Sequence, residues 1–187
     1  LGFTFALGIV LLFSRRYSHL RLAQAYALGS AALSILYKFV FPYSRAFYLI
    51  LATGQAILFA LAYWEIAKRQ ENKSFPLLWL AACASLVVPF LPLAISTRGI
   101  LPFFFVDVAI AVTLPFVFRS RNPFLLVWGA MSAFAVVLDV LELILPAQNQ
   151  VLLMMSTLDL WAPILANGGL IAVIAWKPVS AWVYRKL

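Results

Sequence analysis

Cysteine and histidine are nearly absent from this sequence, which contains only Cys83 and His19. A single cysteine excludes an intrachain disulfide, and its apolar surroundings predict that Cys83 is a small buried hydrophobe. A single histidine excludes haem held by two histidines of the chain, and it argues against a histidine-rich zinc site. The sequence has neither a CxxC motif nor a glycine-rich nucleotide-binding loop. No cofactor can be named from these residues.

Charge is also scarce: 11% of the residues are charged and 65% are hydrophobic, with six acids among 187 residues. Soluble domains are about 45–50% apolar and about 25% charged. A water-soluble core of this length could not hide so much apolar surface. The composition therefore predicts an all-α integral membrane protein, with the lipid bilayer as a partner.

Apolar runs divide the chain into a single polytopic domain of seven transmembrane helices. A spanning helix needs about 20 apolar residues. The first run is shorter, and we expect it to be the C-terminal part of a helix that begins upstream, because the sequence does not start with Met. The expected helices cover residues 1–13, 22–41, 46–67, 75–95, 100–118, 124–145 and 151–176, followed by an interfacial tail at 177–187.

The basic residues predict the orientation of this bundle. Eleven of the 14 Lys and Arg residues fall on one side of the predicted membrane, and only Lys38, Arg45 and Arg98 fall on the other. Because cytoplasmic loops are enriched in Lys and Arg, the N-terminus is predicted outside and the C-terminus in the cytoplasm. The net charge of +8 is thus explained by loops at a cytoplasmic (inner) membrane rather than by a nucleic-acid surface.

Four acids lie inside apolar segments and form the predicted site. Asp107, Asp139, Glu142 and Asp159 all fall in the outer half of the predicted membrane, on three consecutive helices. Ionisable groups at such depth are costly and usually functional. The hypothesis is a ligand or ion site made by these acids, with three further residues as candidate partners: Lys38, Arg98 and Asn167. Structural pairing of the acids with the outer cations or with nearby hydroxyls is an equal alternative.

The last predicted helix contains the sequence L-D-L-W-A-P, from Leu158 to Pro163. The topology resembles that of microbial rhodopsins, which carry a retinal-linking lysine one turn after an aspartate, but Pro163 occupies that position after Asp159. A three-plus-one-plus-three layout around the proline-interrupted fourth helix would resemble sugar transporters of the SWEET type. The topology also resembles the seven-helix membrane input modules that precede bacterial signalling domains.

These observations lead to three functional expectations. The first is a non-catalytic sensor or receptor module, or an accessory subunit of a larger membrane complex, whose partners are other membrane subunits or a cytoplasmic signalling domain. The second is a proton- or cation-coupled carrier of small solutes that uses the four acids. The third is a lipid hydrolase based on carboxylates, which requires two acids to converge.

Overall fold

The computed structural model describes residues 2–13, 19–68, 75–120, 122–145 and 150–175. Within them every regular element is a helix, so the all-helical prediction is confirmed for this part of the chain. The elements, in chain order, are α1 (Gly2–Phe13), α2 (Arg21–Phe39), α3 (Arg45–Lys68), α4 (Phe75–Val87), the short 3₁₀ helix η2 (Val88–Phe90), α5 (Ile95–Ser120), α6 (Pro123–Ile144) and α7 (Gln150–Ala175). The expected tail at 177–187 lies outside the described residues.

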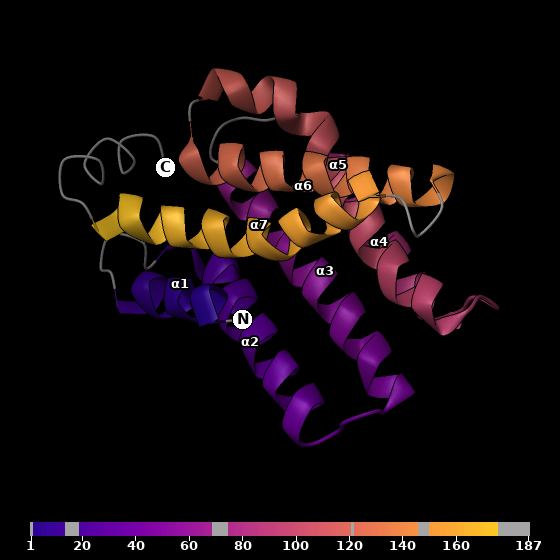
Figure 1. Cartoon of the computed structure of the whole chain (residues 1–187). Helices are drawn as coiled ribbons and strands as arrows, with labels where there is room; N and C mark the ends of the chain where they lie inside the picture. The colour runs from indigo at the N-terminus through magenta and orange to yellow at the C-terminus, as the bar shows by residue number, and fades with distance from the viewer. Residues whose placement is uncertain (1, 14–18, 69–74, 121, 146–149, 176–187) are drawn as a thin grey trace.

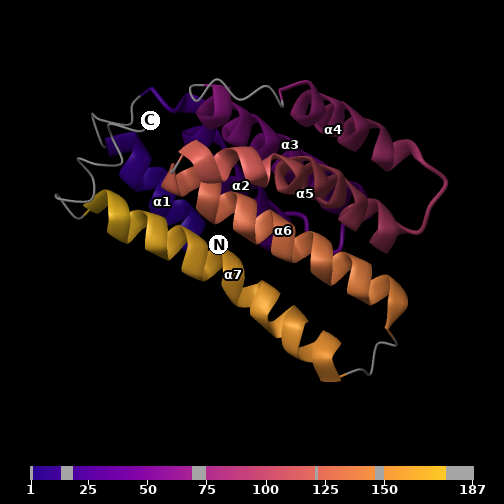
Figure 2. The same ribbon diagram turned by 90° about the horizontal axis from the view of Figure 1, so that it is seen from above.

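The helices form a closed ring with one helix outside it. Each of α2, α3, α5, α6 and α7 packs against the next in that order, and α1 packs against both α2 and α7. Helix α4 packs against α3 and α5 from the outside (Figures 1 and 2). The ring therefore brings helices from the first and last thirds of the chain around a common centre.

Buried small residues line one face of α2 and one face of α3, and the α2 stripe faces Gly8 of α1 at Ala27. Both helices carry buried alanines at intervals of four residues, which places the alanines along one face of each helix. Such small-residue stripes let two helix backbones approach closely, as is common in helix pairs within membranes. The stripes are Ala23, Ala27 and Ala31 on α2, and Ala52, Ala56 and Ala60 on α3.

A cluster of aromatic side chains fills the centre of the ring. Trp128 of α6 is fully buried, and its ring contacts those of Tyr26, Phe59 and Phe124 at centroid distances of 5.7, 5.5 and 5.8 Å. All three contacts are edge-to-face, the geometry that aromatic pairs prefer. One large side chain thereby ties α2, α3 and α6 together.

The fourth predicted helix is interrupted where its prolines begin. Helix α4 ends at Val87, η2 follows, and Leu91 is extended, whereas the sequence predicted a helix to residue 95. Pro89 and Pro92 lack the N–H group that a continuing helix needs and clash with the preceding turn. The side chain of Arg98 then joins η2 to α5, because its Nη1 donates to the carbonyl of Pro89 at 2.9 Å.

The N-terminus of α2 is capped by a residue of α3. Its N-cap residue, Leu20, has no side chain that can cap. Instead, one carboxylate oxygen of Glu65 accepts hydrogen bonds from the backbone N–H groups of Leu22 and Ala23, at 2.9 and 3.1 Å. The i,i+4 spacing of Glu65 and Arg69 also predicts an ion pair, but Arg69 lies outside the described residues.

Two helices in the described ranges are long and apolar enough to cross a membrane, Arg45–Lys68 and Pro123–Glu142. Only 39% and 33% of their apolar windows are buried within the chain. Core helices of soluble proteins can meet the same length and composition test, so the seven-span topology remains a prediction. Cys83 is exposed on α4, so the prediction of a buried cysteine is wrong; its helix is the one that lies outside the ring.

Candidate functional site

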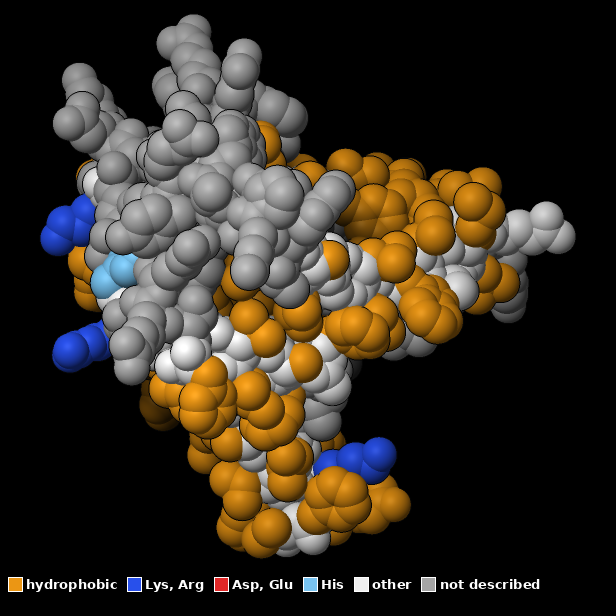
Figure 3. All heavy atoms as spheres, turned by 90° about the vertical axis from the view of Figure 1, so that its left-hand side faces the viewer, with side chains coloured by type: hydrophobic (Ala, Val, Ile, Leu, Met, Phe, Trp, Pro, Cys, Tyr) orange, Lys and Arg blue, Asp and Glu red, His pale blue; other side chains and the backbone are white. Residues whose placement is uncertain are grey.

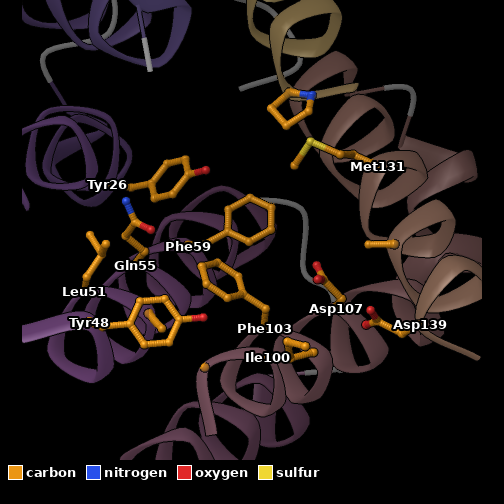
Figure 4. A pocket seen from close by; sticks show the side chains of 14 residues that line it. Tyr26, Tyr48, Leu51, Gln55, Phe59, Ile100, Phe103, Asp107, Met131 and Asp139 are labelled. Atoms are coloured by element: carbon orange, nitrogen blue, oxygen red, sulfur yellow. The ribbon is translucent and has the colours of Figure 1, made fainter. Parts of the chain in front are cut away.

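A partly open cavity of about 450 Å³ lies among five helices of the ring (Figure 4). Its polar lining residues are Tyr26 on α2, Tyr48 and Gln55 on α3, Asp107 on α5 and Asp139 on α6. Apolar and small residues complete the wall, including two phenylalanines, Phe59 and Phe103, and the helical proline of α7, Pro163. The cavity is thus built from residues that are up to 137 positions apart in the sequence.

Two of the four predicted acids meet in this cavity. Asp107 is buried, with 8% of its surface exposed, and Asp139 is half-buried. Their carboxylates project from neighbouring helices into the same space, as Figure 4 shows. The Tyr26 phenol lines the same cavity. Acids of two consecutive helices therefore line one cavity, and their function as a ligand or ion site stays a prediction.

Glu142 and Asp159, the other two predicted acids, are not among the described residues that line the cavity. Glu142 is exposed and does not line the cavity. It follows Asp139 by three residues, which corresponds to a rotation of about 300° around the helix, and it lies one turn nearer the end of α6. Asp159 belongs to α7, but its side chain lies outside the described residues.

The two basic residues predicted as partners of the acids, Lys38 and Arg98, do not line the cavity. Lys38 is exposed in the last turn of α2, and its ammonium lies 5.8 Å from the ring centroid of Phe39. Arg98 is half-buried at the start of α5, where it bonds to Pro89 as described above. Neither residue lines the cavity with Asp107 and Asp139.

Asn167, the last predicted site residue, joins three helices. It is 2% exposed, its Oδ1 accepts from Trp128 Nε1 at 3.5 Å, and its Nδ2 donates to Thr4 Oγ1 at 3.1 Å. It does not line the cavity. The neighbouring Gly168 packs so closely on Phe3 that a Cβ there would lie 3.2 Å from its ring. This part of α7 therefore anchors α1 and α6.

Sequence reasoning missed the uncharged polar residues of the cavity. Gln55 lies in the middle of an apolar helix, which is itself a signal, because an amide there requires partners. Its Nε2 donates to the carbonyl of Ser30 at 3.1 Å and to Ser34 Oγ at 2.9 Å, both on α2. Tyr48 is placed by Gly99 of α5, since a Cβ at that position would collide with the tyrosine ring. No sequence pattern links these residues to the acids.

Two carboxylates and three uncharged polar side chains line the described part of the cavity. Within the described residues, no group of three or more His, Cys, Asp and Glu side chains is placed to hold a metal ion. Comparison of the chain with protein families, curated proteins and solved structures yields no match. The function must therefore be argued from the cavity itself.

Proposed function

We propose that the chain is a seven-helix integral membrane protein with its N-terminus outside and its C-terminus in the cytoplasm. The bias of eleven to three in Lys and Arg supports this orientation. Large hydrophobic side chains are exposed along the helices, among them Ile50 on α3, Leu80 on α4, Ile144 on α6 and Leu165 on α7. In the space-filling view, hydrophobic side chains cover both lobes around a deep notch (Figure 3). A lipid bilayer would cover this surface.

Within that membrane protein, we propose that the cavity binds a cation, and that the module acts as a sensor or as an accessory subunit of a larger membrane assembly. One observation carries the proposal: Asp107 and Asp139, on different helices, line one cavity large enough for a ligand. Two carboxylates in a largely apolar surrounding attract positive charge strongly, because water screens them less there. The third expectation, a lipid hydrolase based on carboxylates, also requires two converging acids, and lipid turnover that survives Asp107→Asn and Asp139→Asn would exclude it.

A cation-coupled carrier is the second candidate. Pro163 lies inside α7 and also lines the cavity. A proline within a helix removes a backbone hydrogen bond and permits a kink, so that a change in cavity charge could be linked to bending of α7. Under this alternative the same acids would bind the coupling ion or the solute.

The membrane topology can be tested at the two ends of α3. In a Cys83→Ser background, Tyr43→Cys precedes α3 and Lys68→Cys ends it; both positions are exposed. We expect a membrane-impermeant maleimide added to intact cells to label Tyr43→Cys, and to label Lys68→Cys only after permeabilisation. Equal labelling of both variants in intact cells would contradict the spanning topology.

The binding function can be tested with the protein in nanodiscs. Inorganic and organic cations are added separately, and thermal unfolding is followed. We expect stabilisation by at least one cation, because a ligand present at about 100 times its Kd stabilises by about 2.7 kcal/mol. Asp107→Asn and Asp139→Asn should abolish the stabilisation, whereas Glu142→Gln, on the same helix as Asp139, should retain it. Cation-driven solute uptake into proteoliposomes would favour the carrier over the sensor.

A further inference from the structure

The size of the cavity points to an organic ligand. Its volume is about 450 Å³, whereas a water molecule, comparable in size to a small inorganic ion, occupies about 30 Å³ in the liquid. Pockets for organic ligands span about 300–1,000 Å³. A bare ion would contact only a small part of this wall.

The donor set also differs from that of an inorganic cation site. Hard cations such as Ca²⁺ take about six to eight oxygen ligands. Two carboxylates enter the cavity, and no group of three or more metal-binding side chains occurs in the described part of the chain. Among the described residues, the two acids thus supply negative charge along one side of a larger space.

The orientation of Gln55 adds a hydrogen-bond acceptor to the cavity. Because its Nε2 donates to Ser30 and Ser34 of α2, its amide nitrogen is held against that helix. The amide oxygen is left on the cavity side, as Figure 4 shows. An oxygen acceptor and two carboxylates favour a ligand that carries N–H donors.

Aromatic rings provide the remaining specificity. Tyr26 and Phe59 contact each other at a centroid distance of 5.0 Å, and both line the cavity with Tyr48 and Phe103. Aromatic faces attract a cation and also pack against apolar groups. A bare ion would use only the first of these properties, whereas an amine with an apolar body would use both.

We propose, building on the cation-binding function above, that the cavity takes a protonated organic amine whose ammonium lies at Asp107 and Asp139 and whose apolar body lies against Tyr26, Phe59 and Phe103. The ammonium N–H groups donate to the carboxylates of Asp107 and Asp139. The ligand class is therefore a small hydrophobic monoamine.

The test uses 2-phenylethylamine as the probe, with the protein in nanodiscs and equilibrium binding as the readout. Three matched compounds separate the contributions: 2-phenylethanol lacks the charge, tetramethylammonium lacks N–H donors, and Na⁺ lacks the apolar body. We expect the amine to bind most tightly. Asp107→Asn and Asp139→Asn should each weaken its binding roughly 10- to 100-fold, the range for a hydrogen bond to a charged group.

Two further variants distinguish direct contact from misfolding. Ala135→Phe should block the amine by filling the cavity without removing a charge, since Ala135 lines the wall. Glu142→Gln serves as the control and should bind normally.

The outcomes separate this inference from the function on which it rests. Acid-dependent binding of Na⁺ or another inorganic cation, with no binding of the amine, would overturn the amine inference and leave the cation-binding function intact. Equal binding of 2-phenylethanol and 2-phenylethylamine would also overturn it. Failure of every cation to bind would overturn both.

Discussion

Removal of the Glu65 carboxylate should destabilise the fold measurably, although this residue is remote from the cavity. Glu65→Ala leaves the N–H groups of Leu22 and Ala23 without their acceptor at the first turn of α2. Loss of a capping side chain costs about 0.5–2 kcal/mol, and loss of a negative charge near a helix N-terminus costs about 0.3–1 kcal/mol more. Since Glu65 is half-buried and water can replace it only partly, we expect a loss of about 2 kcal/mol.

This loss can be measured by thermal unfolding in detergent, with circular dichroism as the signal. For a chain of this length, 1 kcal/mol corresponds to roughly 2–4 °C in Tm, so Glu65→Ala should lower Tm by about 4–8 °C. Glu65→Gln keeps an acceptor oxygen and should lose about half as much. Hydrogen exchange should accelerate at Leu22 and Ala23 first, because their N–H groups are the ones released.

The matched control is Glu142→Ala, which removes an exposed acid from the last turn of α6. Exposed substitutions of this kind usually change stability by less than about 0.5 kcal/mol. Equal Tm values for Glu65→Ala and the parent, or unchanged exchange at the first turn of α2, would refute the capping role.

Two other substitutions and one control probe the packing of the ring. Gly99→Ala should displace the ring of Tyr48 and cost about 1–3 kcal/mol in the free energy of unfolding. Its control is Gly169→Ala, where an added Cβ meets no atom within 4 Å, so this variant should be neutral or stabilising. Similar Tm values for the two variants would contradict the packing of Tyr48 against α5. Asn167→Ala should cost about 1–3 kcal/mol, because the buried Trp128 Nε1 loses its acceptor. Chemical denaturation in mixed micelles measures this loss, and an unchanged midpoint would show that the amide does not anchor α6 and α7.

The amino-acid sequence by itself determined that the chain is helical and where its apolar segments lie. Long apolar runs bounded by charged and turn residues give this information locally, because each helix satisfies its own backbone hydrogen bonds. The same local reading predicted an interruption at the prolines of the fourth helix, but it extended that helix to residue 95, whereas α4 ends at Val87. It also identified Asp107 and Asp139 as unusual, since an acid within an apolar run requires an explanation.

Only the tertiary structure decided which of these residues meet. Asp107 and Asp139 share a cavity with Tyr26 and Gln55, whereas Glu142, only three residues from Asp139, is exposed. Glu65 caps a helix more than 40 residues away in the sequence. Periodicity predicts the face of a helix on which a residue lies. The helix that packs against that face is decided by side chains from distant segments of the chain. Because the hydrophobic effect is not directional, a sequence pattern does not identify that partner helix.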